Sequence, residues 1–382
     1  MTQALFSCVI NNGGMRRIAQ WAFRYSEEFD DVFFIIFSSD DIKTNKNLMH
    51  VQLDKFNNIF TEEIIEKYQS ALKTQLGNRE FSFKIADYMT LAYIDFIKIP
   101  TVYDTHILGK PLHDSILKTS NLLKFDGVFF KKAITSIVDL MSFSFLRFEN
   151  SWIKHADAYI TNSEMTSEHL KKYYKDQIEN KNVFHIPLPG ADKKKELSEY
   201  SKRKFKYNIY TFARVHPQKG FHFILNNDWS KAGITIRGLD INLLTSEGQK
   251  KLTQKNITNL SWTNSQSQLE LDILSSRFIL FPSIYEPFGL ALQEALSLGS
   301  ICICHTNNSG HEEQITHGIN GFLVDMETED WISIFDELQK MDIKKLDEIS
   351  RNAIQSVNFG DKKRNQIFHK FIQQQNSDFS CS

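Results

Sequence analysis

The stretch Phe278–Leu298 constrains the fold of this chain more than any other part of its sequence. Phe278–Phe281 is a short apolar run typical of a buried parallel strand, and Pro282 and Ser283 end it. Gly289 then begins a largely apolar pattern that predicts a buried helix. A strand, a tight loop and a buried helix N-terminus together present free backbone N–H groups, so this stretch predicts an anion site.

Two glutamates flank the predicted anion site. Glu286 lies in the loop before the helix, and Glu294 lies inside the helix. From Gly289 to Glu294 a helix rises roughly 7.5 Å, close to the separation of a diphosphate from its ribose. A carboxylate accepts two hydrogen bonds in a fork, which suits a vicinal diol such as ribose O2′/O3′. The pair is therefore a candidate nucleotide site; the alternative is a loop glutamate and a helix-surface glutamate without a ligand.

Length and composition exclude several classes of protein. The 382 residues are 41% hydrophobic and 24% charged, which is typical of a globular protein with room for two domains. The net charge of −1 gives no reason to expect nucleic acid as a partner. The first residues lack the basic and long apolar regions of a signal peptide, and the four scattered cysteines fit reduced thiols. The expected location is the cytoplasm.

Strand and helix patterns alternate in both halves of the chain, which predicts an α/β fold with two Rossmann-like, doubly wound domains. Asp192–Lys206 is charged and lacks hydrophobic periodicity, as a linker does. The predicted boundaries are 1–190 for the N-terminal domain, 191–206 for the linker, 207–358 for the C-terminal domain and 359–382 for a final helix returning towards the first domain.

The patterns also predict the individual elements. Strands are expected at Ala4–Ile10, Val32–Phe37, Thr101–His106, Asp157–Thr161, Val183–Leu188, Tyr207–Ala213, Ile234–Arg237, Ile257–Trp262, Ser300–Cys304 and Gly321–Val324. Helices are expected at Met15–Phe29, Glu62–Leu76, Gly220–Asn226, Gln268–Leu274, Asp330–Lys340, Lys344–Val357 and Asp361–Gln374, with Ser163 as an N-cap and with a turn and helix start at Gly310–His317.

Two further candidate features follow predicted strands of the first half. Gly13 and Gly14 would let the backbone approach a ligand closely, or would form a tight turn without one. The pattern is not G-x-G-x-x-G, which disfavours a dinucleotide cofactor. His106 lies at the carboxyl end of a predicted strand, where ligands of open α/β sheets bind. It could hydrogen-bond a sugar hydroxyl or serve the structure alone.

Arg214 and Lys219 follow the first predicted strand of the second half. Two cations near one point suit a diphosphate, arginine as a planar fork and lysine as a point charge, although bases on a solvated loop are the alternative. The sequence has no D-x-D pair, the spacing that commonly holds Mg²⁺ or Mn²⁺ on a nucleotide diphosphate. We therefore expect no metal at this site.

Residues 122–148 mix aromatic and basic side chains. An amphipathic helix with Lys131 and Lys132 on its polar side can rest on an anionic membrane surface. One hypothesis is therefore peripheral contact with the inner face of the plasma membrane. The other is a helical excursion packed on its own domain.

The combination of motifs resembles the GT-B retaining glycosyltransferases of family 4. The segments that carry this resemblance are ARVHPQKG, YEPFGLALQEAL and NNSGHEEQITHGINGFLVD in the second half, and NNGGMRR, TVYDTH and ADAYITNSE in the first. It covers nearly the whole chain and implies two Rossmann-like domains facing a central cleft. The chain departs from the family at Ala213, where glycine is usual, and at Ser309-Gly310-His311, which replaces a more usual Gly-Gly start.

The resemblance implies roles for the residues of the second half. Arg214 and Lys219 would hold the donor diphosphate, and Glu294 would bind the ribose. Glu286 would face the donor sugar. The backbone of Phe288, Gly289 and Leu290 would lie near the sugar and the phosphate.

For the first half, the resemblance implies that the loop of Gly13 and Gly14 closes on the diphosphate and that His106 contacts the sugar from the facing side. The implied reaction is retaining transfer from a UDP- or GDP-sugar to a glycan or lipid-linked acceptor in cell-envelope polysaccharide synthesis, with no further cofactor. The leaving diphosphate would take the acceptor proton on the same face of the sugar. Two alternatives stay open: a GT-B-type nucleotide-sugar epimerase, and a nucleotide-sugar-binding scaffold without turnover.

Overall fold

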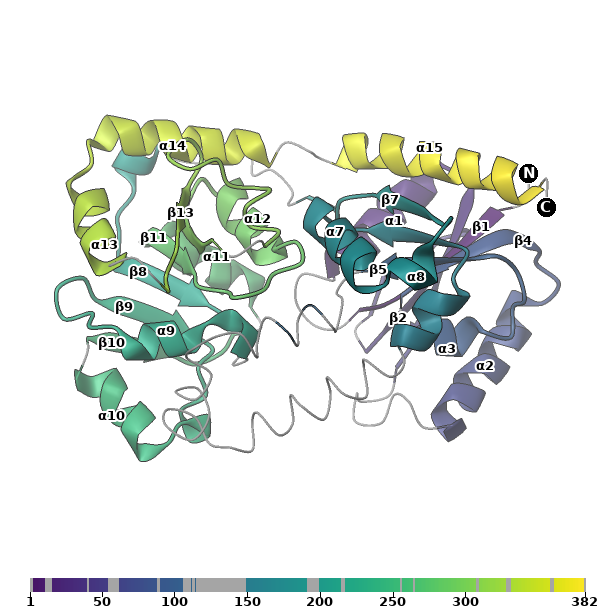
Figure 1. Cartoon of the computed structure of the whole chain (residues 1–382), viewed down its shortest axis with the longest axis horizontal. Coiled ribbons are helices and arrows are strands. Elements are labelled where there is room, and N and C mark those ends of the chain that lie inside the picture. The colour runs from purple at the N-terminus through teal and green to yellow at the C-terminus, as the bar shows by residue number, and fades with distance from the viewer. Residues whose placement is uncertain are drawn as a thin grey trace. The chain divides into compact units, whose positions relative to one another are not determined.

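The computed structural model describes most of the chain. The described residues are 3–10, 16–39, 41–53, 62–87, 90–105, 111, 114, 149–190, 199–213, 217–254, 256–263, 265–306, 309–327, 331–357 and 361–380. They form two compact units (Figure 1). The first takes residues up to 105, 149–189 and 361–380; the second takes 111, 114 and 190–357.

The first unit is built on a parallel sheet in which seven strands are described, in the order β3-β2-β1-β4-β5-β6-β7. The strands are β1 (Gln3–Ile10), β2 (Val32–Ser38), β3 (Leu48–Gln52), β4 (Phe81–Ala86), β5 (Thr101–Thr105), β6 (Ala158–Thr161) and β7 (Asn182–His185). The helices are α1 (Arg16–Glu28), α2 (Glu62–Leu76), α3 (Leu91–Ile94), α7 (Glu164–Tyr173), α8 (Lys175–Ile178) and α15 (Asp361–Ser380). The strand order reverses between β1 and β4, as in a doubly wound fold.

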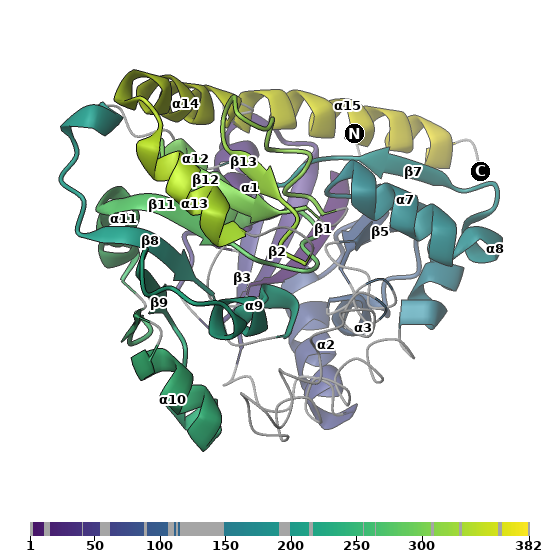
Figure 2. The same cartoon turned by 60° about the vertical axis from the view of Figure 1, so that its left-hand side comes forward.

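The C-terminal helix α15 belongs to the first unit, although the whole second unit separates it in sequence from the other elements of the first (Figure 2). The indole Nε1 of Trp21 donates a hydrogen bond to Oδ1 of Asn365 at 2.8 Å. The rings of Trp21 and Phe368 pack edge to face with centroids 5.0 Å apart. Burial of these aromatic side chains in one cluster joins α15 to α1 and the sheet, because large apolar surface is removed from water there.

The second unit repeats the plan with six described strands in the order β10-β9-β8-β11-β12-β13, all parallel. The strands are β8 (Tyr207–Phe212), β9 (Ile234–Arg237), β10 (Ile257–Leu260), β11 (Ser276–Phe281), β12 (Ile301–His305) and β13 (Phe322–Val324). The helices are α9 (Phe221–Asn226), α10 (Ser246–Gln254), α11 (Gln266–Leu274), α12 (Leu290–Ser297), α13 (Trp331–Lys340) and α14 (Ile343–Ser356), with short 3₁₀ turns at Tyr200–Lys202, Pro217–Lys219 and Ile241–Leu243.

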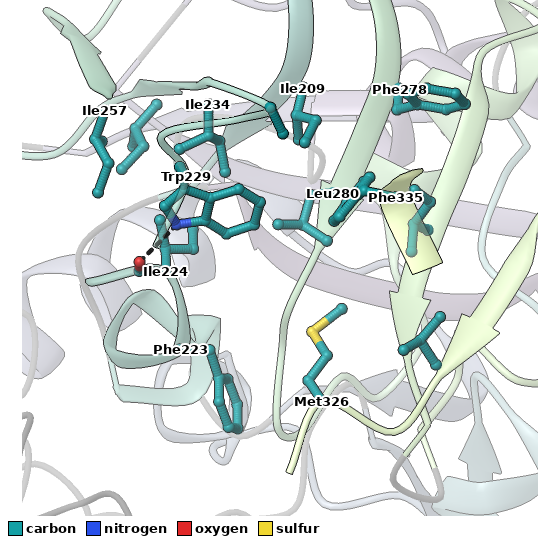
Figure 3. Packing of buried hydrophobic residues seen from close by; sticks show 14 of the residues in the cluster. Ile209, Phe223, Ile224, Trp229, Ile234, Ile257, Phe278, Leu280, Met326 and Phe335 are labelled. Atoms are coloured by element: carbon teal, nitrogen blue, oxygen red, sulfur yellow. Dashed lines mark hydrogen bonds between the residues drawn. The ribbon is translucent and has the colours of Figure 1, made fainter. Parts of the chain in front are cut away.

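Successive residues of the central strands supply two cores, one on each face of this sheet. Phe278 and Leu280 join a cluster with α9 and α13, whereas Ile279 and Phe281 join a cluster with α11 and α12. Figure 3 shows Trp229 within the first cluster, where its Nε1 donates to the carbonyl oxygen of Ile224 at 2.8 Å. Apolar residues on both faces explain why these strands appear as unbroken apolar runs.

Most predicted elements are present, with ends shifted by a few residues, and the Ser163 hydroxyl accepts the amide of Thr166 as the predicted N-cap. The helix start predicted at Gly310–His317 is wrong, because residues 310–314 form a turn. The strands β3 and β4 and the helix α10 were not predicted. Residues 199–206 of the predicted linker pack on the second unit, with Tyr200 buried in its core. None of the described helices is long and apolar enough to cross a membrane.

Candidate functional site

The candidate site lies where the strand order of the second sheet reverses. Strands β8 and β11 pair in parallel, with Tyr210 beside Ile279. The two strands that separate them in the sequence, β9 and β10, lie on the other side of β8. The loops that follow both strands therefore start from neighbouring points at the carboxyl edge of the sheet. This is the position at which doubly wound sheets bind their ligands.

Lys219 and Glu286 come from these two loops and form an ion pair, Nζ to Oε2. Their side chains are only 22% and 16% exposed, so water screens the pair less than it would a surface pair. Two hydrogen bonds between the loops support it. The backbone amide of Ile284 donates to the carbonyl oxygen of Gln218 at 2.8 Å, and the side-chain amide of Gln218 donates to the carbonyl oxygen of Tyr285 at 2.7 Å. The structure thus brings a predicted cation and a predicted carboxylate together.

Gly220 allows the two loops to approach this closely. Its φ is +67°, and a Cβ at this position would lie 1.9 Å from the carbonyl oxygen of Pro282. Any other residue would both strain the backbone and push the β11 loop away. Gly220 is therefore required by geometry immediately after Lys219.

Gly289 is the N-cap of α12, with φ +95°. Phe288 is buried beside it, and the helix begins at Leu290 as predicted. The first-turn N–H groups of a helix have no partner within the helix and carry the positive end of its dipole. Three of the predicted donor-contacting residues, Phe288–Leu290, thus stand next to the Lys219–Glu286 pair.

Glu294 lies one turn further along α12 and is partly exposed, between the buried side chains of Gln293 and Ala295. The helix that contains Glu294 is largely apolar in sequence. The structure places Glu294 at the margin of the core, where a carboxylate can remain solvated and accept hydrogen bonds from a ligand.

The turn 309–314 is hydrogen-bonded to the loop before α12. The amide of Gly310 donates to the carbonyl oxygen of Glu286 at 2.7 Å, and Gln314 Nε2 donates to the carbonyl oxygens of Phe288 and, at 3.0 Å, of Gly310. A Cβ on Gly310 would lie 2.5 Å from the carbonyl oxygen of Pro287. The loop conformation is therefore fixed by a second loop that the sequence did not connect with it.

His311 in this turn is 1% exposed, and burial lowers its pKa to about 4; Glu286 opposes that shift and Lys219 adds to it. The imidazole is therefore neutral at pH 7. Its ring lies 5.6 Å from the ring of Phe281, centroid to centroid.

The other end of α12 is fixed as well. Arg203 donates from Nη2 to the carbonyl oxygen of Leu298 at 2.8 Å and from Nη1 to that of Gly299 at 3.1 Å. The hydroxyl of Ser350 donates to the same Gly299 oxygen at 2.6 Å. A cation at a helix C-terminus interacts favourably with the helix dipole, so Arg203 stabilises the C-terminal end of α12 by charge.

Trp262 was not identified from the sequence. It follows β10 and is 54% exposed, and a Cβ on Gly238 would lie 2.7 Å from its ring and 2.8 Å from the carbonyl oxygen of Ala213. An exposed indole thus lies at the carboxyl edge of β8, β9 and β10, on the same edge as Lys219. The signal available in the sequence was a tryptophan at the carboxyl end of a predicted strand.

Four predicted site residues, Gly13, Gly14, His106 and Arg214, lie outside the described residues, as does the whole of the segment 122–148. Among the residues that are described, no three His, Cys, Asp or Glu side chains are grouped so as to hold a metal ion. Cys8, Cys302 and Cys304 are buried free thiols.

Comparison with known proteins finds a family match over part of the second unit. Residues 232–356 match the family described as Glycosyl transferases group 1. The chain is 28% identical over 149 residues to an uncharacterized 41.2 kDa protein in the cps region of Klebsiella pneumoniae. It is 26% identical over 179 residues to the UDP-N-acetylglucosamine–peptide N-acetylglucosaminyltransferase GtfA subunit of Streptococcus agalactiae. These alignments cover 37% and 46% of this chain, and 40% and 35% of the relatives.

Solved structures resemble the whole chain. Sucrose-phosphate synthase from Thermosynechococcus elongatus aligns over 100% of both chains with a TM-score of 0.69 at 14% identity. Anabaena HepE in complex with UDP-glucose aligns over 98% of this chain and 100% of its own, with a TM-score of 0.62 at 16% identity. At such identities the likeness establishes the fold, and it confirms the prediction of two parallel-sheet α/β domains. The chain has the GT-B fold of glycosyltransferases, and its residues 232–356 match the Glycosyl transferases group 1 family.

Proposed function

We propose that the protein is a retaining, metal-independent glycosyltransferase that moves a sugar from a UDP- or GDP-sugar to a glycan or lipid-linked acceptor. The observation that carries this proposal is the Lys219–Glu286 ion pair beside Gly289, at the N-terminus of α12 and at the strand-order reversal of the second sheet. A cation, free helix amides and a ligand-facing sheet edge then converge on one point.

In this proposal the donor diphosphate binds between Lys219 and the first turn of α12. Without a ligand, the Glu286 carboxylate supplies the negative partner of the Lys219 ammonium. A diphosphate brings a greater negative charge to the same cation, which frees Glu286 to accept hydrogen bonds from hydroxyls of the donor sugar. Arg214 acts as the second cation, as the sequence motif predicts.

The nucleoside is assigned to the neighbouring surface. Glu294 is one helical turn beyond the proposed diphosphate site and accepts the two ribose hydroxyls. Trp262, exposed at the same sheet edge, offers a face on which the base stacks. HepE was solved with UDP-glucose and the GtfA subunit is a UDP-N-acetylglucosamine transferase, which supports a nucleotide sugar as the ligand class.

The chemistry proposed for this arrangement is stabilisation of a leaving group. Cleavage of the sugar–oxygen bond places negative charge on the departing diphosphate, and preorganised cations and helix amides lower the free energy of that charge without a divalent metal. The acceptor oxygen bonds to the anomeric carbon on the face from which the diphosphate departs, and the departing diphosphate takes the proton of that acceptor hydroxyl, so the configuration is retained. Gly13 and Gly14 close over the diphosphate and His106 contacts the sugar in this scheme.

The acceptor is assigned from a relative and from the segment 122–148. The Klebsiella relative is named for a cps region, which favours an envelope polysaccharide or a lipid-linked glycan. The aromatic and basic segment 122–148 would then touch the inner face of the plasma membrane. Co-sedimentation with anionic vesicles tests this contact, and the double variant Lys131→Ala/Lys132→Ala should lose it; a wild-type protein that stays in the supernatant contradicts it.

The central experiment is a thermal-shift panel of UDP- and GDP-sugars in the presence of EDTA, because a ligand that binds the folded state raises its apparent stability. The best donor is then incubated with acceptor glycans, and the anomeric configuration of the product is read by NMR. A product of retained configuration, formed in EDTA, is expected. No stabilisation by any nucleotide sugar, loss of turnover in EDTA, or an isomerised nucleotide sugar formed without acceptor would each refute the proposal.

A further inference from the structure

The turn that carries His311 packs against the loop that we propose binds the donor. Gly289 has no Cβ, and a Cβ built there would lie 2.5 Å from Cδ2 and 2.8 Å from Nε2 of His311. These separations are shorter than any ordinary contact between a carbon atom and a ring, so the imidazole fills the space that a side chain at residue 289 would need. The edge of the ring therefore abuts the residue that precedes the first turn of α12.

The conformation of Gly289 needs such support. Its φ of +95° and ψ of +57° place it outside the conformations that most residues adopt, and glycine loses more backbone freedom on folding than any other residue. The direction of the first amides of α12 depends on these two angles. A rigid aromatic ring against Gly289 restricts both angles before any ligand binds.

The ring is also unusual for a purely structural contact. Nδ1 of His311 is buried and has no hydrogen-bond partner among the residues that the structure describes, which is a cost that a phenylalanine or leucine at this position would avoid. The neutral state of the ring has a consequence for its neighbours. A charged imidazolium so close to Glu286 would compete with Lys219 for that carboxylate, whereas a neutral ring leaves the ion pair intact.

We propose that His311 is a positioning residue for the donor: its ring holds Gly289, and through it the first amides of α12, in the conformation that receives the diphosphate. This inference rests on the proposed function, since it concerns the same site. His311 acts through Gly289 and is not assigned a contact with the substrate.

A double-mutant cycle on the full chain tests the inference, with the dissociation constants of UDP and GDP measured by calorimetry. His311→Ala should weaken binding of the better nucleotide about tenfold, and His311→Phe, which keeps a flat neutral ring, should stay within about threefold of wild type. Gly289→Ala should weaken binding strongly in wild type but at least about fivefold less in the His311→Ala background, because the ring that meets the new Cβ is gone.

A matched control separates positioning from loss of stability. His305 is a second buried histidine of the same unit, whose ring packs on Phe223 at 5.4 Å between centroids. His305→Ala should lower the melting temperature while leaving the nucleotide affinity unchanged. Additive effects of Gly289→Ala and His311→Ala would overturn the positioning role of His311 and leave the proposed function standing. Equal losses of affinity in His305→Ala and His311→Ala would do the same. A wild-type protein that binds neither nucleotide would instead overturn the proposed function, and this inference with it.

Discussion

Lys219 and Glu286 are 67 residues apart in the chain, yet the ammonium of one contacts the carboxylate of the other at the start of α12. Each side chain has a separate role in the proposed reaction. Substitution of a single side chain at this site is therefore the first test of the proposed reaction.

Removing Lys219 should abolish most transfer. Lys219→Ala takes away a cation from the leaving diphosphate, and loss of one such preorganised group typically costs about 3–4 kcal/mol of transition-state stabilisation, or about 10²–10³ in rate. Glu294→Ala should likewise abolish transfer, because the ribose is no longer held. Steady-state kinetics measure both, with circular dichroism to verify folding. Lys231→Ala on the exposed surface is the control, and wild-type turnover in both site variants would refute the assignment.

Replacing Trp262 should weaken nucleotide binding. Stacking of a base on an aromatic side chain is worth about 1–3 kcal/mol, so Trp262→Ala should raise the dissociation constant of UDP or GDP about tenfold. Leu271→Ala is the matched control, since Leu271 is also exposed, on α11, and has no assigned contact. Equal affinities in the wild type and the Trp262 variant would remove the base from this surface.

Gly220→Ala should destabilise the second unit through a backbone clash. The new Cβ would meet the carbonyl oxygen of Pro282 and the left-handed backbone would be strained, so we expect a loss of about 3 kcal/mol in urea unfolding. Gly318→Ala is a control for the strain alone, because Gly318 has φ +75° but nothing within 4 Å of its Cβ position. It should lose only about 1 kcal/mol. Equal losses would show that the two loops can separate freely.

The stability of the protein should fall as the pH falls from about 6.5 to about 4. Burial lowers the pKa of His311 to about 4 in the folded state, whereas the unfolded chain takes up the proton near pH 6.5. Between these values the unfolded state binds more protons, so the free energy of unfolding decreases with pH, by about 3 kcal/mol at the lower limit. Urea unfolding of wild type and His311→Phe at several pH values measures this.

The His311→Phe variant should retain a shallower pH dependence, because burial also lowers the pKa of His305. His155→Gln, at an exposed position, is the control and should follow the wild-type curve. Superimposable curves for wild type and His311→Phe would show that the imidazole is not kept neutral by the fold.

Breaking the buried ion pair between Arg237 and Asp272 should cost stability without changing nucleotide affinity. Arg237 Nε donates to Asp272 Oδ2 at 2.7 Å, and the hydroxyl of Tyr210 donates to the same oxygen at 3.2 Å. Asp272→Ala leaves the guanidinium buried without its anion, which typically costs about 3–5 kcal/mol. Glu348→Ala breaks the exposed pair with Lys345 and should cost under about 1 kcal/mol. If Asp272→Ala loses nucleotide binding and Glu348→Ala keeps it, the Arg237–Asp272 pair belongs to the nucleotide site.

The sequence was most informative where strands are buried on both faces. β11 and α12 were predicted almost to the residue. A short unbroken apolar run is typical of a buried strand, and the glycine that opens the next apolar pattern marks the start of a helix. β4 was missed since Lys84 interrupts it, and the structure satisfies that lysine by a hydrogen bond from Nζ to the carbonyl oxygen of Ile97 at 2.6 Å. α10 was missed because its sequence, SEGQKKLTQ, has almost no apolar face.

The candidate site was predictable only in part for a related reason. The motif residues Lys219, Glu286 and Gly289 each follow a strand, so chain order alone brought them to one edge of the sheet. The contact between Gly289 and His311 has no such local signature. It depends on the turn 309–314, where the sequence predicts a turn and a helix start. Only the turn forms, and in it Gly310 lies against Pro287 and Phe288.

The carbonyl oxygen of Gly299 receives hydrogen bonds from Arg203, on the segment that follows Gly190, and from Ser350, on α14, which leads towards α15. Two segments of the second unit that are about 150 residues apart in the chain are thus hydrogen-bonded to one atom at the C-terminus of α12. This helix is only eight residues long, so these hydrogen bonds fix its C-terminus about two turns from the N-terminus at which we propose that the anion binds.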